Sequence, residues 1–245
     1  MRRTKIICTM GPATDNEDVL RDLMLNGMDV ARLNFSHGSH EEALERINRI
    51  KKVRDELNIP VAILLDTKGP EVRIKDFKEG KVELKEGQKF TLCTDDVVGD
   101  ENQVSITYAN LPNDVKVGSK ILIDDGLIEM EVISVKNSKI LCKVKNGGVV
   151  SNKKGVNVPN VALSMPYMSQ KDIDDILFGI EQDVDFIAAS FVRTANDIRE
   201  IKTLLRDNGG RDIRIIAKIE NAEGVDNIDD IIRETHGIMV ARGDM

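Results

Sequence analysis

The pattern of apolar and polar positions changes twice along the chain. In residues 1–69, short apolar runs alternate with segments in which apolar residues recur every three to four positions. This alternation is typical of strands that alternate with amphipathic helices. Helices are expected from Thr14, where Glu17 completes a capping-box spacing, and from Ser39, where Glu42 does the same. Strands are predicted over 4–10, 29–35 and 61–65.

Turn residues divide the middle of the chain into short pieces. From about residue 71 to 165, alternating segments such as VELKEGQKFTLC and SKILIDDGLIEMEV are separated by Gly and Asn. Such segments predict hairpins, and no helix of useful length is expected among them. Residues 70–165 are therefore predicted to form a small all-β domain inserted into an α/β domain, which comprises 1–69 and 166–245.

The first pattern resumes at about residue 166. Helices are expected after Ser169 and over 194–208 and 225–234, and the pair Asp174 and Asp175 is expected on a solvated helix face. Strands are predicted over 185–192, 214–220 and 237–242. Repeated strand–helix units predict an α/β fold with a parallel sheet, either open or closed as a (β/α)8 barrel.

Composition excludes some classes of function. The formal net charge is −7, and Lys and Arg are spread along the chain without forming a basic segment. This distribution argues against a nucleic-acid-binding protein, as does the absence of Trp. No apolar run reaches the roughly 18 residues of a membrane span. The three cysteines are isolated, which favours a reducing, cytoplasmic setting.

Polar residues stand at the carboxyl ends of four predicted strands, where a barrel places its active site. The four sets are Arg32, Asn34 and Ser36; Asp66 and Thr67; Lys218 and Glu220; and Arg242 and Asp244. Within a strand, alternate residues share a face, so each set points to one side. Polar residues are common at strand ends, but four converging sets are interpreted as one site.

The residue types indicate chemistry on a phosphate. Lys218 and Glu220 alone are compatible with a simple salt bridge or with an anion site beside a metal site. Glu220 and Asp244 offer hard oxygen ligands suited to Mg²⁺ or Mn²⁺. Arg32 and Lys218 suit an anion. A weakly held monovalent cation fits the oxygen donors of Asn34, Ser36, Asp66 and Thr67. Cations gathered around a phosphate are what phosphoryl transfer needs.

Two familiar motif types give little evidence of function here. His37 and His40 are three residues apart, but without a third ligand nearby they are interpreted as part of a helix start rather than a zinc site. The sequence contains neither a Walker A motif nor GxGxxG, so a nucleotide would be bound in another way.

Seven segments, in order and spacing, resemble the pyruvate kinase family: TKIICTMGPA, ARLNFSHG, LLDTKGPEVR, NKKGVNVP, FIAASFVR, IIAKIENAEGV and MVARGDM. The resemblance runs from Thr4 to Met245. It implies the N-terminal portion of such an enzyme, with a (β/α)8 TIM-barrel A domain that is incomplete here, having six βα strands. The family's β-rich B domain interrupts the barrel after the third strand.

The resemblance also implies roles for individual residues. Arg32 is expected to bind the phosphate of phosphoenolpyruvate, and Lys218 to stabilise charge on the transferring phosphoryl group and the enolate. The backbone of Gly243 is expected beside the substrate carboxylate. Glu220 and Asp244 are expected to hold the Mg²⁺ (or Mn²⁺) that bridges substrate and phosphate. The expected K⁺ ligands are Asn34, Ser36, Asp66 and Thr67, and the expected nucleotide-binding residues are His37, Arg73 and Lys154.

The implied reaction converts phosphoenolpyruvate and ADP to pyruvate and ATP. A homotetramer is expected for the full-length family member, with no nucleic acid or membrane as partner. Family members with Lys at the position of Glu71 can dispense with the monovalent cation, so K⁺ dependence is expected here. Family members continue beyond the ARGD motif, and the 245 residues alone are expected to be inactive.

Two other hypotheses remain. A metal-dependent aldolase or lyase of the phosphoenolpyruvate/pyruvate barrel group would also use acidic metal ligands and an enolate. The inserted β domain and the set of Arg32, Asn34 and Ser36 disfavour it. A non-catalytic binding or folding module is the second alternative.

Overall fold

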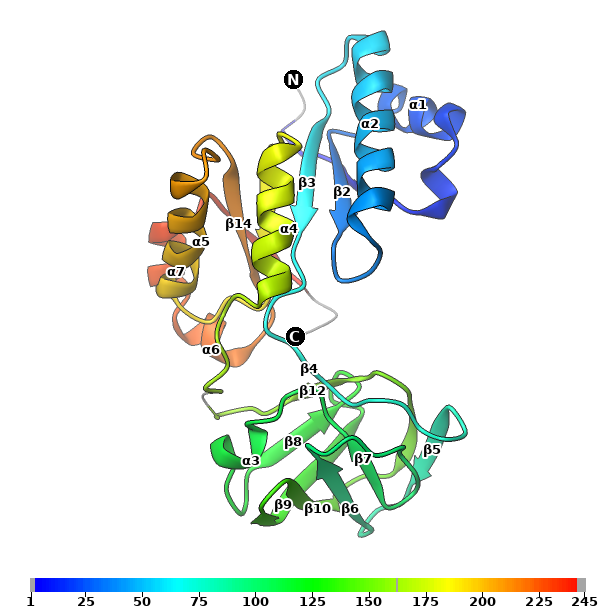
Figure 1. The fold of residues 1–245 in the computed structure, drawn as a ribbon, viewed down its shortest axis with the longest axis vertical. Coiled ribbons are helices and arrows are strands. Elements are labelled where there is room, and N and C mark those ends of the chain that lie inside the picture. Colours follow the sequence, from blue (N-terminus) through cyan, green and yellow to red (C-terminus); the bar gives the residue numbers. More distant parts are fainter. Residues whose placement is uncertain (1–2, 162, 242–245) are drawn as a thin grey trace. The chain divides into compact units, whose positions relative to one another are not determined.

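The computed structural model describes residues 3–161 and 163–241. Their contacts divide the chain into two compact units. The first contains the described residues of 1–69, 167–220 and 224–241, and the second those of 70–166 together with 221–223. The first unit is α/β, and the second consists mainly of short strands (Figure 1).

A six-stranded parallel sheet forms the centre of the first unit. Its strands follow the chain in the order β1 (Ile7–Thr9), β2 (Val30–Asn34), β3 (Ala62–Asp66), β13 (Phe186–Ala189), β14 (Arg214–Ile219) and β15 (Gly237–Val240). The order never reverses, whereas an open doubly wound sheet reverses at its ligand site. Right-handed crossovers in an unreversed sheet keep the helices on one face, as in a barrel. This order therefore favours a barrel segment over an open sheet.

Helices connect these strands, as Figure 1 shows. They are the 3-10 turn η1 (Pro12–Thr14) and the α-helices α1 (Glu17–Leu25), α2 (His40–Leu57), α4 (Gln170–Glu181), α5 (Ala195–Asp207), α6 (Ala222–Asp226) and α7 (Ile228–Glu234). The N-terminal caps of α2, α4 and α5 are Ser39, Ser169 and Thr194, which confirms three predicted helix starts.

Two helix predictions were wrong. The first helix begins not at Thr14 but after Asn16, whose side chain accepts a hydrogen bond from the backbone of Asp18. Thr14 instead closes the preceding turn, where its Oγ1 accepts a hydrogen bond of 2.9 Å from Gly11 N. The single helix predicted over 225–234 is two, because the chain breaks at Asn227 between α6 and α7.

Alternation along the strands gives the sheet two different faces. Ala31 and Leu33 of β2 pack with Ile63 and Leu65 of β3 and with Ile47 of α2 in one hydrophobic core. The intervening positions face away from the helices; we call this side the inner face, and it carries Arg32, Leu64, Ala188 and Lys218. Leu64 and Ala188 are buried there outside the helix-facing core. Charged side chains thus share the inner face with apolar ones.

The second unit is built from short strands around a core of its own. These are β4 (Val72–Arg73), β5 (Lys81–Leu84), β6 (Lys89–Cys93), β7 (Gln103–Ser105), β8 (Lys120–Ile123), β9 (Ile128–Lys136), β10 (Lys139–Val144), β11 (Gly148–Ser151) and β12 (Gly155–Asn157). Seven form one sheet, mostly antiparallel, in the order β4-β12-β8-β9-β10-β6-β7, and β11 pairs with β5. The one helix among its described residues within 70–166, α3 (Leu111–Asp114), has four residues.

Candidate active site

Lys218 stands at the centre of a hydrogen-bonded cluster on the inner face. Its Nζ lies 2.9 Å from Ser190 Oγ and 3.2 Å from Asp66 Oδ1. A third acceptor, Glu220 Oε1, lies 2.9 Å away. An ammonium group has three N–H donors, so these acceptors can use all of them. The cluster joins the carboxyl ends of three strands, β3, β13 and β14.

Asp66 connects Lys218 to Arg32. Its Oδ2 accepts a hydrogen bond of 2.5 Å from Arg32 Nε, while its Oδ1 faces Lys218. Arg32 Nη1 also donates to Thr9 Oγ1 of β1 at 2.8 Å. Asp66 is only 1% exposed, and a carboxylate buried to this extent needs paired charges. One carboxylate thus holds both predicted anion-binding cations on the same face.

Ser190, which was not predicted as a site residue, lies inside this cluster. Its Oγ accepts from Lys218, and its single hydroxyl proton faces Thr67 O at 2.6 Å and Asp66 Oδ1 at 3.0 Å. Strand β13 ends at Ala189, whereas the predicted strand ran on to residue 192 and counted Ser190 as interior. If the strand had been predicted to end at Ala189, Ser190 would have been recognised as a polar residue at a strand end, like the residues of the other four sets.

Tyr167 holds the backbone of Ser190 in place. The phenol donates a hydrogen bond of 2.9 Å to Ser190 O. Burial raises the pKa of Tyr167 well above its usual value, and the nearby carboxylates of Asp197, Asp172 and Glu220 act in the same direction. The hydroxyl therefore remains a protonated donor at neutral pH.

Glu220 has a partner for each carboxylate oxygen. Oε1 faces Lys218, and Oε2 accepts a hydrogen bond of 2.7 Å from the backbone N–H of Phe191. Phe191 has a φ of 52°, in the left-handed region that bulky residues rarely adopt. Such a conformation costs about 1–2 kcal/mol, so the surrounding contacts must hold it. Lys218 and Glu220 do form a salt bridge, and it is part of a larger cluster.

The predicted potassium ligands lie at the ends of two adjacent strands. Asn34 of β2 is paired with Asp66 of β3 in the sheet register. Asn34 Oδ1 accepts a hydrogen bond of 3.0 Å from Ser36 N, which places Ser36 in the turn directly after the strand. Thr67 follows Asp66 and is buried. These residues offer oxygen donors and one carboxylate, which fits a hard monovalent cation.

One of the two predicted magnesium ligands can be located. Glu220 is 3% exposed, and its carboxylate offers the hard oxygen ligands that suit a divalent cation. Arg242, Gly243 and Asp244 lie outside the described residues. Among the residues that the structure describes, no group of three or more His, Cys, Asp or Glu side chains could hold a metal ion.

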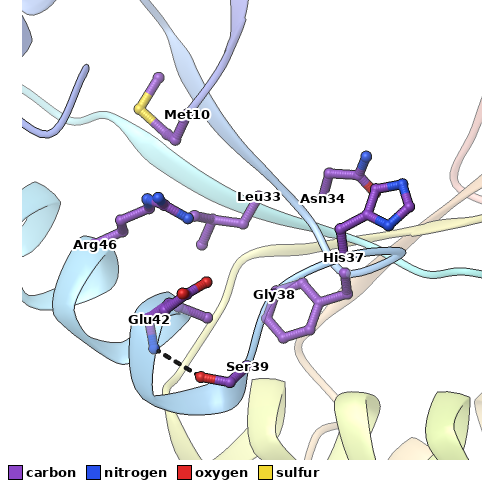
Figure 2. Close-up of a pocket in the computed structure, with 10 residues that line it drawn as sticks. Met10, Leu33, Asn34, His37, Gly38, Ser39, Glu42 and Arg46 are labelled. Atoms are coloured by element: carbon purple, nitrogen blue, oxygen red, sulfur yellow. Dashed lines mark hydrogen bonds between the residues drawn. The ribbon is translucent and has the colours of Figure 1, made fainter. Parts of the chain in front are cut away.

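His37 lies on the loop between β2 and α2, residues 35–39. Figure 2 draws His37 and Asn34 among the residues that line one pocket, together with the Ser39 cap on Glu42 N at the start of α2. A cavity of about 30 Å³ lies beneath this loop, between the end of β2 and α2. Such a volume holds one or two waters. A nucleotide near His37 would have to lie outside this cavity.

The two other predicted nucleotide-binding residues belong to the second unit. Arg73 lies on β4, where its Nε pairs with Glu71 Oε1 at 2.8 Å and its Nη1 donates to Lys153 O at 2.7 Å. Lys154 directly precedes β12 and pairs with Asp124 Oδ1 at 2.9 Å. Both cations are thus held by neighbours within their own unit.

Comparison with known proteins agrees with this geometry. Residues 1–245 match the family model described as the barrel domain of pyruvate kinase. The chain belongs to the pyruvate kinase family. Its unreversed parallel sheet with polar strand ends on the inner face is the start of the pyruvate kinase barrel.

Curated pyruvate kinases resemble the chain along its whole length. The enzyme of Clostridium perfringens is 50% identical over 246 residues, which cover 100% of this chain and 52% of that protein. The enzyme of Geobacillus stearothermophilus is 54% identical over 246 residues, covering 100% of this chain and 42% of that protein. That of Bacillus licheniformis is 51% identical, again with 42% covered. The chain spans about half the length of these relatives, or less. No helix among its described residues is long and apolar enough to cross a membrane.

Proposed function

We propose that the polypeptide carrying this chain is a pyruvate kinase, which transfers the phosphoryl group of phosphoenolpyruvate to ADP. The P–O bond to the enol oxygen breaks, and a bond to a β-phosphate oxygen of ADP forms. The enolate left behind takes up a proton at carbon and becomes pyruvate. The observation that carries this proposal is the pairing of both Arg32 and Lys218 with Asp66, in a chain that belongs to this family.

Arg32 and Lys218 would act on the phosphate. Their side chains are 25% and 11% exposed, so both are partly accessible while Asp66 holds them. Because their positions are fixed before substrate arrives, they need little reorganisation as charge develops on the transferring group. Lys218 would stabilise charge on the phosphoryl group and the enolate, and Arg32 would bind the phosphate.

Two cations complete the proposal. Glu220 and Asp244 would hold Mg²⁺ (or Mn²⁺), with the substrate carboxylate beside Gly243 and Asp244. K⁺ would be held by Asn34, Ser36, Asp66 and Thr67. When bound, the ions supply positive charge that offsets the charge of the phosphates.

The remaining assignments concern the nucleotide, the domains and the assembly. His37, Arg73 and Lys154 would contact ADP or ATP. Residues 1–69 and 166–245 would form part of the barrel domain, and 70–165 the inserted B domain. The full-length protein would be a cytoplasmic homotetramer.

Pyruvate formation tests the proposed function. The natural polypeptide that carries these 245 residues, at its natural length, would be mixed with phosphoenolpyruvate, Mg²⁺ and K⁺, with and without ADP. We expect pyruvate and ATP in equal amounts, and only when ADP is present. Pyruvate release without ADP would mean that water accepts the phosphoryl group, and it would contradict the proposed transfer to ADP. Thermal stabilisation by ADP with Mg²⁺ would argue against a lyase, which has no use for ADP.

A further inference from the structure

A buried carboxylate on α4 holds the first residue of α2. Asp175 is 1% exposed, although its position was predicted to be solvated. Its Oδ1 lies 2.7 Å from His40 Nε2, and its Oδ2 lies 2.7 Å from Lys171 Nζ. A carboxylate this deeply buried is costly unless both oxygens are satisfied, and here each has its own partner.

Aromatic packing fixes the imidazole in the same place. The His40 ring stacks on Phe178, with 4.5 Å between centroids and 19° between planes. The centroid of the Phe35 ring lies 6.1 Å from that of His40 and 5.9 Å from that of Phe178. Stacking of this kind stabilises the pair beyond the burial of the two rings, so the orientation of the imidazole is well defined. His40 and Asp175 therefore form a joint between α2 and α4.

The joint lies at one end of the loop that carries predicted ligand-binding residues. His40 directly follows this loop, residues 35–39, which includes Ser36 and His37. The other end is held at the sheet, where Phe35 N donates to Asp66 O at 2.9 Å. Ser36 and His37 lie between the two anchors.

We propose that His40 and Asp175 are positioning residues, which set the place of loop 35–39 and so of Ser36 and His37. The proposal rests on the function proposed above. Loss of the contact between His40 and Asp175 would weaken binding of the monovalent cation at Ser36 and of the nucleotide at His37. The phosphate-binding cations are fixed separately, because Asp66 holds Arg32 and Lys218 on the inner face.

Three variants separate positioning from general stability. His40→Phe keeps an aromatic ring against Phe178 but removes the hydrogen bond to Asp175. His40→Gln keeps a donor for the carboxylate. Lys171→Met is the matched control, because it removes the other partner of Asp175 without touching the loop. Melting temperatures identify any variant that is not folded.

Two measurements on the natural-length protein decide the proposal. In His40→Phe we expect the K⁺ concentration for half-maximal activity to rise about tenfold, as is typical when a partner that orients a ligand is lost. The KM for phosphoenolpyruvate should change far less. His40→Gln should recover much of the loss, and Lys171→Met should resemble the wild type.

Hydrogen exchange of the amides of residues 36–39 is independent of catalysis. We expect faster exchange in His40→Phe than in the wild type or Lys171→Met. Equal exchange in all three, or an equal rise in the K⁺ requirement of His40→Phe and Lys171→Met, would overturn the proposal. A wild type that forms no pyruvate would instead refute the proposed function, and the exchange rates would still show whether the joint anchors the loop.

Discussion

Asp66 and Lys218 form an ion pair at 3.2 Å, although 152 positions separate them in the chain. Asp66 also holds Arg32 at 2.5 Å, so one buried carboxylate places both cations that are proposed to bind phosphate. Removing one partner of a buried pair typically costs about 3–5 kcal/mol, because the other charge is left uncompensated. Variants at these positions must therefore be tested for folding as well as for activity.

Replacing Lys218 by Met should abolish most of the activity. Removing a preorganised group that stabilises developing charge typically lowers kcat by about 10²–10³-fold. Initial rates of pyruvate formation at saturating substrates would measure the loss, and thermal unfolding would show whether the variant is folded. Lys120→Met, which removes an ion pair with Glu129 at the surface of the second unit, is a matched control and should keep wild-type rates. A folded Lys218→Met variant within tenfold of the wild type would contradict the assigned role.

Ser190→Ala should lower both stability and activity. It removes an acceptor of Lys218, and a buried donor left unsatisfied costs about 1–3 kcal/mol. Ser105→Ala is a suitable control, because Ser105 is equally buried and donates to Asp95 O at 2.6 Å in the second unit. Chemical denaturation should show that both variants are destabilised. Only Ser190→Ala should lower kcat, by about tenfold, since it alone loosens a group at the proposed site. Equal kcat in the two variants would show that Ser190 has only a structural role.

Activity should require K⁺. The side chain of Glu71 carries no positive charge to replace the cation, and it pairs with Arg73. We expect rates in tetramethylammonium buffer to fall at least about tenfold below those in K⁺. The variant Glu71→Lys should depend less on K⁺. Undiminished activity of the wild type without K⁺ would contradict the proposed potassium site.

His236 should make stability depend on pH below neutrality. Burial, and then the positive charges of Arg214 and Lys202, lower the pKa of His236, whose Nδ1 accepts a hydrogen bond of 3.0 Å from Ile215 N. The unfolded chain regains a value near 6.5, so it binds more protons than the folded chain just below that pH. The stability that the neutral imidazole of His236 contributes is therefore present above about pH 6.5. It is lost as the pH falls through the lowered pKa of His236 in the folded chain.

Urea unfolding at about pH 7.5 and about pH 5.5 would measure this loss for His236. In His236→Asn, the amide oxygen can accept the same hydrogen bond without titrating. The wild type should therefore lose more stability than this variant over that interval. Equal losses would show that the protonation of His236 does not contribute.

Local sequence signals predicted much of the fold, within clear limits. The caps at Ser39, Ser169 and Thr194 were correct because a side chain and a backbone N–H three residues away make a helix start a local event. The break at Asn227 was not visible in the apolar pattern. Asp175 was wrongly predicted to be solvated because its burial depends on His40, which lies 135 positions away in the chain.

The sequence by itself determined which residues alternate to each face of the sheet, because strand period and helix period are local properties of the backbone. It therefore indicated Arg32, Asp66, Lys218 and Glu220 as candidates for one site. Only the tertiary structure decided that Asp66 pairs with both cations, that Ser190 completes the set around Lys218, and that His40 meets Asp175. Each of these contacts joins distant segments, and their partners depend on the order and register of the parallel strands and on the packing of helices beside them.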